Sequence, residues 1–272
     1  MPPTEQPIAF QALALGRHLT VEYYDCDAQV LADTVRMEKL FNEAAVISGA
    51  TVLESSFHEF QPQGVSGIVV ICESHFAVHA WPEHDYAAVD IFTCGDQIDF
   101  ELAAETLRQM LGSRSMVISN AMSRGLIGQN GHLLREEPNH TVVSECTMSW
   151  RKRYESFDAW GMLASIDVYD CPVEMLNQGS VRNLLGMLCE KLNADACCAN
   201  CCVNFHDPER GSGMRFTQIL SNGTVTGRYS VERQALYCDI FLGSFFDPRE
   251  TAEEIINALN GSYYRLQVAM RQ

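Results

Sequence analysis

The chain repeats itself, and this repeat restricts its possible folds more than any other feature. Residues 16–26 recur as residues 161–171, and both segments end in Tyr-Asp-Cys. Later in each copy an Asp-Ile-Phe sequence occurs, within residues 89–92 and 238–241. The matches stay in the same order but their offset grows from 145 (161 − 16) to 149 (239 − 90), which indicates a short insertion. The sequence therefore predicts a unit of roughly 110 residues that occurs twice in tandem.

The hydrophobic pattern of the first copy predicts an antiparallel sheet with helices on one face. An amphipathic stripe from Val35 to Ile47 predicts a helix that Gly49 terminates. The predicted order is strand 19–24, helix 34–48, strands 51–58, 64–72, 76–81 and 87–92, helix 101–111 and strand 116–119. In the second copy, Asp247 and Pro248 predict the start of the matching helix. The predicted fold class is α+β, with two-layer units duplicated in tandem.

The repeat also predicts a domain organisation. We expect a catalytic domain over residues 1–124 and a degenerate second repeat over residues 161–272. Residues 125–160 contain many Gly, Asn, Pro and charged residues at their start, a composition typical of a linker.

Charge and hydropathy exclude several classes of partner. The chain has 19 Lys and Arg against 35 Asp and Glu, for a net charge of −16. We expect neither nucleic acid nor an anionic membrane as a partner, because both need a positive surface. Apolar runs such as residues 67–72 are too short to span a bilayer, and residues 1–12 lack a secretory signal. The 11 cysteines are expected to be reduced thiols, which indicates a cytoplasmic protein.

One segment concentrates groups that can do chemistry. Ser74, His75, His79, Glu83 and Cys94 fall within about twenty residues of one another, beside an apolar strand. From the pattern alone, most such Ser and His side chains have structural roles, and no Gly-x-Ser-x-Gly elbow surrounds Ser74. On a strand, His75 and His79 are about 13 Å apart, so no metal site is expected.

The first copy resembles S-adenosylmethionine decarboxylase in its short prokaryotic form. The resemblance covers about residues 15–119. It is carried by the segments Gly16-Arg17-His18-Leu19, Ser48-Gly49-Ala50-Thr51, Gly64-Val65-Ser66-Gly67, Glu73-Ser74-His75, His79 with Trp81-Pro82-Glu83, and Asp90-Ile91-Phe92-Thr93-Cys94-Gly95.

This resemblance implies a proenzyme that cuts itself between Glu73 and Ser74. The Ser74 hydroxyl attacks the preceding carbonyl, and elimination leaves a pyruvoyl group derived from Ser74, which forms a Schiff base with the substrate amine. By the same resemblance, Ser66 stabilises the cleavage intermediate and His79 removes the Ser74 α-proton. Cys94 then returns a proton to the substrate.

The implied substrate is S-adenosylmethionine, decarboxylated to the aminopropyl donor for spermidine synthesis. The resemblance assigns ribose binding to Glu83 and adenine stacking to Phe60. Two alternatives stay open: a pyruvoyl-dependent arginine or ornithine decarboxylase of the same family, and a non-catalytic regulatory paralogue.

The second copy lacks the groups for cleavage. At offset 149, Ser74 matches Gly223, His79 matches Arg228 and Cys94 matches Gly243, while Glu83 matches Glu232. We therefore expect this copy to be non-catalytic, either as a structural support or, less favoured, as a part that regulates or completes the site. The resemblance further implies a homodimer of processed αβ chains, in which each active site draws on both chains.

Overall fold

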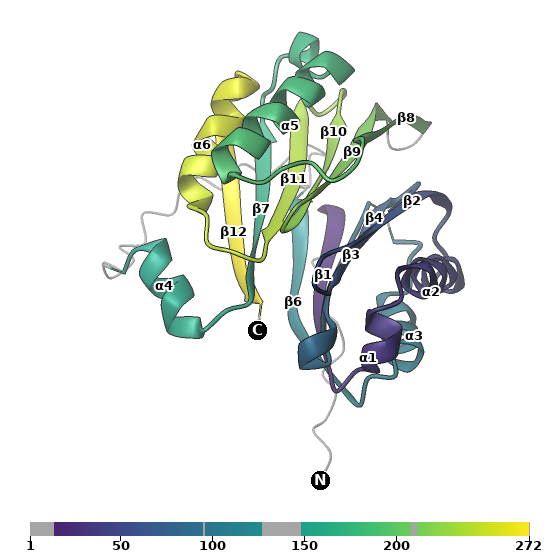
Figure 1. Ribbon diagram of the computed structural model, residues 1–272. Helices are drawn as coiled ribbons and strands as arrows, with labels where there is room; N and C mark the ends of the chain where they lie inside the picture. Colours follow the sequence, from purple (N-terminus) through teal and green to yellow (C-terminus); the bar gives the residue numbers. More distant parts are fainter. Residues whose placement is uncertain (1–13, 95, 127–147, 208–210, 272) are drawn as a thin grey trace. The chain divides into compact units, whose positions relative to one another are not determined.

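The computed structural model describes residues 14–94, 96–126, 148–207 and 211–271. The chain divides into two compact units, Met1–Glu136 and Glu137–Gln272. Each unit contains a six-stranded antiparallel sheet whose long helices cover one face (Figure 1). The predicted α+β fold and its tandem duplication are confirmed.

In the first unit the sheet order is β2-β3-β4-β5-β1-β6, so the first strand is inserted between two strands that come much later in the chain. The strands are β1 (Ala14–Tyr24), β2 (Val52–Glu59), β3 (Val65–Ile71), β4 (Ser74–Trp81), β5 (Tyr86–Thr93) and β6 (Ser115–Leu126). The helices are α1 (Ala28–Leu31), α2 (Thr34–Ile47) and α3 (Phe100–Met110), with a 3-10 turn, η1, at Pro82–His84.

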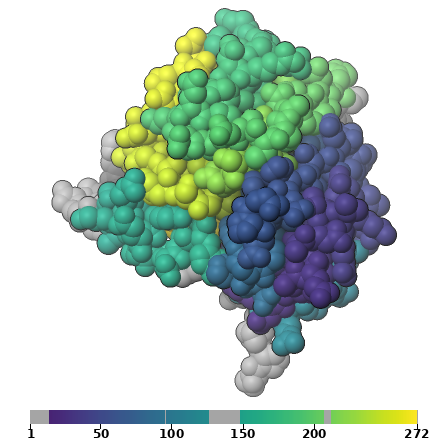
Figure 2. All heavy atoms as spheres, in the orientation of Figure 1, coloured from purple at the N-terminus to yellow at the C-terminus, as the bar shows by residue number. Residues whose placement is uncertain are grey.

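The core of the first unit lies between its helices and its sheet. Alternate residues of each strand face the helices, as Leu19, Val21 and Tyr23 of β1 do. Helix α2 presents a buried stripe that includes Leu40 and Phe41. The buried side chains of this layer form one hydrophobic cluster. The space-filling view shows the outer surface of the first unit in purple and blue (Figure 2).

Local signals explain where the helices begin and end. The Asp33 carboxylate accepts a hydrogen bond from the backbone N–H of Arg36, and Asp99 caps α3 in the same way through Leu102. Beyond the end of α2, Gly49 has a φ of 98°, a left-handed conformation that favours glycine.

The second unit repeats this architecture. Read from the opposite edge, its sheet order is β8-β9-β10-β11-β7-β12, which matches the first unit strand for strand. The strands are β7 (Gly161–Tyr169), β8 (Cys201–Asp207), β9 (Gly211–Leu220), β10 (Gly223–Ser230), β11 (Ala235–Leu242) and β12 (Tyr263–Arg271). The helices are α4 (Trp150–Phe157), α5 (Gln178–Leu192) and α6 (Pro248–Ala258), with a 3-10 turn, η2, at Val173–Met175.

Several details differ from the predicted elements. Helix α1 was not predicted, and β6 continues to Leu126 instead of ending near residue 119. Much of the predicted linker, residues 125–160, lies outside the described residues, and its later part contains α4. In the part of the chain that the structure describes, no helix is both long and apolar enough to cross a bilayer.

Candidate active site

Glu73, Ser74 and Cys94 lie together at one end of the central strands, and we call them the cleavage cluster. A two-residue turn joins β3 to β4, so Ser74 is the first residue of β4. The Glu73 carbonyl oxygen accepts a hydrogen bond from the backbone N–H of Cys94 at 2.8 Å. The Glu73 carboxylate accepts another from the N–H of Thr51 at 3.2 Å. Glu73 is therefore held through both its main chain and its side chain.

This arrangement favours attack on the Glu73 carbonyl. A backbone N–H aimed at a carbonyl oxygen stabilises the negative charge that develops there when a nucleophile adds. The Ser74 hydroxyl belongs to the very next residue. Its oxygen lies 3.4 Å from Nδ1 of His75, which is longer than a typical hydrogen bond and leaves the hydroxyl weakly held. Ser74 is buried, with 3% of its surface exposed.

A second group, the Ser66–His79 cluster, lies toward the other end of β4. Ser66 and His79 are directly opposite in the β3–β4 ladder, and their Oγ and Nδ1 atoms are 2.8 Å apart. Both side chains are buried. At this end of the sheet, Phe60 follows β2 and contacts His58 edge-on, with ring centroids 4.8 Å apart. Glu83 is exposed in the 3-10 turn after β4.

One copy of the first unit does not bring the two clusters together. Ser74 and His79 are five residues apart on one strand, which separates them by about 16 Å. Proton transfer needs a contact of about 3 Å, or one bridging water. Within one first unit, Ser74 and His79 are therefore too far apart for direct proton transfer between them.

The second unit keeps the backbone of the cleavage cluster without its chemistry. The N–H of Gly243 donates to the carbonyl oxygen of Asn222 at 2.7 Å, just as Cys94 donates to Glu73. The residue that follows Asn222 is Gly223, in the position of Ser74. The hydrogen bond to this carbonyl oxygen is thus common to both copies of the fold, whereas the serine hydroxyl is present only in the first copy.

The second unit replaces the Ser66–His79 cluster with two arginines. Arg215 lies opposite Arg228 in the β9–β10 ladder, at the positions of Ser66 and His79. The two guanidinium groups lie 4.2 and 4.6 Å from the ring centroid of Phe205. Glu232, the counterpart of Glu83, accepts the backbone N–H of Ser212 at 2.7 and 2.8 Å. The imidazole of His206 contacts the Ser212 hydroxyl, with Nδ1 and Oγ 2.8 Å apart, but the position of His79 itself holds an arginine.

Cys26 and Cys171 occupy matching places in the two units, each two residues after the first strand of its repeat. Burial raises the pKa of the Cys26 and Cys171 thiols to about 11, which keeps these matching cysteines protonated and unreactive. Among the residues described, no group of three or more His, Cys, Asp or Glu side chains is arranged to hold a metal ion.

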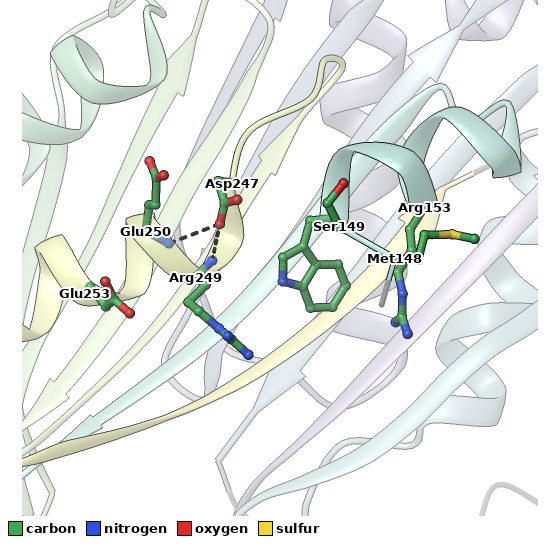
Figure 3. Close-up of a pocket in the computed structure, with 8 residues that line it drawn as sticks. Met148, Ser149, Arg153, Asp247, Arg249, Glu250 and Glu253 are labelled. Carbon is green, nitrogen blue, oxygen red and sulfur yellow. Dashed lines mark hydrogen bonds between the residues drawn. The ribbon is translucent and has the colours of Figure 1, made fainter. Parts of the chain in front are cut away.

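A surface pocket of about 420 Å³ lies in the second unit, between the start of α4 and the start of α6 (Figure 3). Residues that line it include Ser149, Arg153 and Glu253. In Figure 3 the Asp247 carboxylate accepts the backbone N–H groups of Arg249 and Glu250, which is an ordinary helix cap. None of the residues predicted for the active site lines this pocket.

Thr93 is a neighbour of the cleavage cluster for which the sequence predicted no role. It lies opposite Ser74 in the β4–β5 ladder and is fully buried. The available signal was its place directly before Cys94 in the motif of residues 90–95. The sequence does not show that this hydroxyl is opposite Ser74, because the strand register that pairs the two residues is known only from the structure.

Comparison with known proteins identifies the family. The family profile of S-adenosylmethionine decarboxylase matches residues 17–125 and 163–272, which is most of both units. An S-adenosylmethionine decarboxylase proenzyme of Thermosipho melanesiensis is 52% identical over 101 residues, or 37% of this chain and 78% of the relative. A proenzyme of the same name from Pseudomonas aeruginosa is 47% identical over 149 residues, or 53% of this chain and 92% of the relative.

Among solved structures, the adenosylmethionine decarboxylase of Aquifex aeolicus is 30% identical, with a TM-score of 0.41 over 43% of this chain and 97% of that one. The two matched segments of the family profile coincide with the two structural repeats. The chain belongs to the S-adenosylmethionine decarboxylase family.

Proposed function

We propose that this chain is a self-processing, pyruvoyl-dependent decarboxylase of S-adenosylmethionine, which makes the aminopropyl donor for spermidine synthesis. The observation that carries the proposal is the Glu73–Ser74 bond at the start of β4, with its carbonyl hydrogen-bonded to Cys94. Membership of the family supplies the reaction class, and the cleavage cluster supplies the chemistry that the reaction requires.

Cleavage begins with the Ser74 hydroxyl. Its oxygen attacks the Glu73 carbonyl carbon, and the negative charge that forms on the carbonyl oxygen is stabilised by the Cys94 N–H. The bond from Glu73 to the Ser74 nitrogen breaks, the nitrogen takes up the hydroxyl proton, and an ester replaces the amide. Burial of the turn excludes water that would otherwise compete with the hydroxyl.

Elimination then releases the two chains. A base removes the Ser74 α-proton, the ester oxygen leaves with the Glu73 carboxylate, and water converts the remaining enamine to the terminal ketone with loss of ammonia. We assign the base to His79, whose hydrogen bond to Ser66 orients its ring. Ser66 also serves as a hydrogen-bond donor to the cleavage intermediate.

The surroundings of Ser74 fit a pyruvoyl group. Ser74 is buried at the start of β4, so cleavage before it would leave the new N-terminus inside a packed site. A pyruvoyl ketone supplies the electron sink for loss of carbon dioxide from an amine-bearing substrate. Cys94 holds the proton that replaces the lost carboxylate. Phe60 stacks on the adenine, and the exposed Glu83 carboxylate accepts hydrogen bonds from the ribose.

Because one first unit separates Ser74 from His79, the proposal requires a second copy. The second unit of the same chain offers Arg228 at that position, and an arginine is not a base. We therefore propose a homodimer in which the first units of two chains each complete the other's site. Sedimentation should give twice the chain mass.

Chain cleavage and substrate choice test the function together. The purified protein should contain a fragment that ends at Glu73 and a fragment that begins with a pyruvoyl group, and Ser74→Ala should remain one chain. Carbon dioxide should be released from carboxyl-labelled S-adenosylmethionine. Release from labelled arginine or ornithine instead would favour the related decarboxylases, and an uncut, inactive wild-type chain would favour the regulatory paralogue.

A further inference from the structure

The row of residues that contains Ser74 places one buried hydroxyl beside it. Ser74 is opposite Ile71 on one side and opposite Thr93 on the other. Thr93 is in turn opposite Arg17 of β1. Thr93 has no exposed surface, and its Oγ1 has no hydrogen-bond partner among the residues that the structure describes. A buried hydroxyl without a partner lowers the stability of a fold, so its presence calls for an explanation.

The ladder geometry aims the Thr93 side chain at Ser74. The Cys94 N–H donates to the Glu73 carbonyl, and Cys94 and Glu73 are therefore a hydrogen-bonded pair of the antiparallel ladder. Such pairs alternate with non-hydrogen-bonded pairs, in which the Cα atoms approach to about 4.5 Å and the side chains lie closer. Ser74 and Thr93 form the next pair along the ladder and project from the same face.

The second unit shows that a hydroxyl is not needed at this place for the fold. Offset 149 carries Ser74 to Gly223 and Thr93 to Leu242, and these two residues are opposite each other in the β10–β11 ladder. A Cβ placed on Gly223 would lie 2.9 Å from Cδ2 of Leu242. The side chain at this position therefore reaches the residue at the cleavage position. Where the serine is lost, the hydroxyl beside it is lost too.

We propose that Thr93 is a positioning residue for chain cleavage, whose hydroxyl accepts the hydrogen bond of the Ser74 hydroxyl and turns Ser74 Oγ toward the Glu73 carbonyl carbon. The weak 3.4 Å contact with His75 leaves Ser74 free to make this rotation. In the step itself the Oγ–C bond forms, the C–N bond breaks and the hydroxyl proton ends on the Ser74 nitrogen. Thr93 is unchanged and no other reactant is needed. The inference rests on the proposed function.

The test compares variants that differ by one hydroxyl. Thr93→Val keeps the shape and removes the oxygen, while Thr93→Ser keeps the oxygen. The uncut chains are refolded from denaturant, and cleavage is followed with time by denaturing gel and intact mass. We expect Thr93→Val to cleave about ten-fold more slowly than wild type, which corresponds to about 1.4 kcal/mol of barrier. Thr93→Ser should stay within about two-fold.

Thermal unfolding separates positioning from folding. In a Ser74→Ala background no chain is cut. There, the chain with Thr93→Val should unfold at the same temperature as the chain that keeps Thr93, or at a higher one, because the substitution removes an unpartnered hydroxyl. If Thr93→Val folds poorly, Thr93→Ser and Thr93→Ala give the same one-oxygen comparison. Cleavage of the hydroxyl-free variants at the wild-type rate would overturn the assignment. If the wild-type chain itself stays uncut, the proposed function fails, and this inference fails with it.

Discussion

Two variants that are each unable to cleave should restore cleavage when they share a dimer. Ser74→Ala removes the nucleophile and leaves His79 intact, whereas His79→Ala removes the base and leaves Ser74 intact. Within one first unit these residues are about 16 Å apart along β4, so each site takes the two residues from different chains. Either variant alone lacks one of the two residues at every site. A mixed dimer contains one site with both residues and one site with neither.

Pairing statistics set the expected yield. If equal amounts of the two chains are refolded together and pair at random, half of the dimers are mixed. One chain in each mixed dimer is cut, so roughly a quarter of all chains should be cleaved, and every cut chain should carry His79→Ala. Distinguishable tags and intact mass identify which chain was cut.

The same measurement contains its own controls. Each variant refolded alone should show little cleavage, and a mixture of Ser74→Ala with the matched double variant, Ser74→Ala and His79→Ala, should show none. An uncut mixture would refute shared sites. Cleavage of Ser74→Ala alone would refute the role of the hydroxyl, and normal cleavage of His79→Ala alone would show that another group acts as the base.

Three further changes probe separate parts of the fold. Cys94→Ser should leave chain cleavage intact, because the N–H that contacts the Glu73 carbonyl is main chain, but should lower kcat about 100-fold, measured with labelled substrate. Gly223→Ala should lower the unfolding temperature by several degrees, since its Cβ would clash with the carbonyl oxygen of Phe241 in β11. Hydrogen bonds from Arg108 lower the pKa of Glu105 from 4.5 to about 2, so Glu105→Gln should cost less than about 1 kcal/mol at pH 7 in urea unfolding, and this difference should fade as the pH drops from about 4.5 toward 2.

Sequence patterns predicted the strands with a buried face better than those without one. Strands β3 and β5 are apolar and bounded by turns, and they begin or end within a residue or so of their predicted limits. Strand β6 runs through Ser119, Asn120 and Ser123, which carry no strand signal, because it is held by its ladder with β1. Helix α1 is a single turn capped by Asp27, too short to leave a periodic pattern.

The pairing register of the strands decides which site residues lie close together, and a single sequence does not reveal that register. Ser66 and His79 are thirteen residues apart in the chain, yet they share a hydrogen bond because their strands pair. Ser74 and His79 are only five residues apart, yet they are distant because they share an extended strand. The fully buried Arg124, whose guanidinium lies 4.5 Å from the ring centroid of Phe92, also escaped prediction, since burial of arginine is rare.

The insertion of β1 between β5 and β6 decides what the cut does to the molecule. After cleavage, β1, β2 and β3 belong to the fragment that ends at Glu73, and β4, β5 and β6 belong to the other. Three of the five ladders in this described sheet, β3–β4, β5–β1 and β1–β6, then join different polypeptides. The fragments are interdigitated and stay associated without a covalent bond. Once denatured, however, they must meet again in solution, so folding that was first order for the intact chain becomes second order in concentration. The sheet therefore forms readily when the uncut precursor folds, but it re-forms slowly from the two separated fragments.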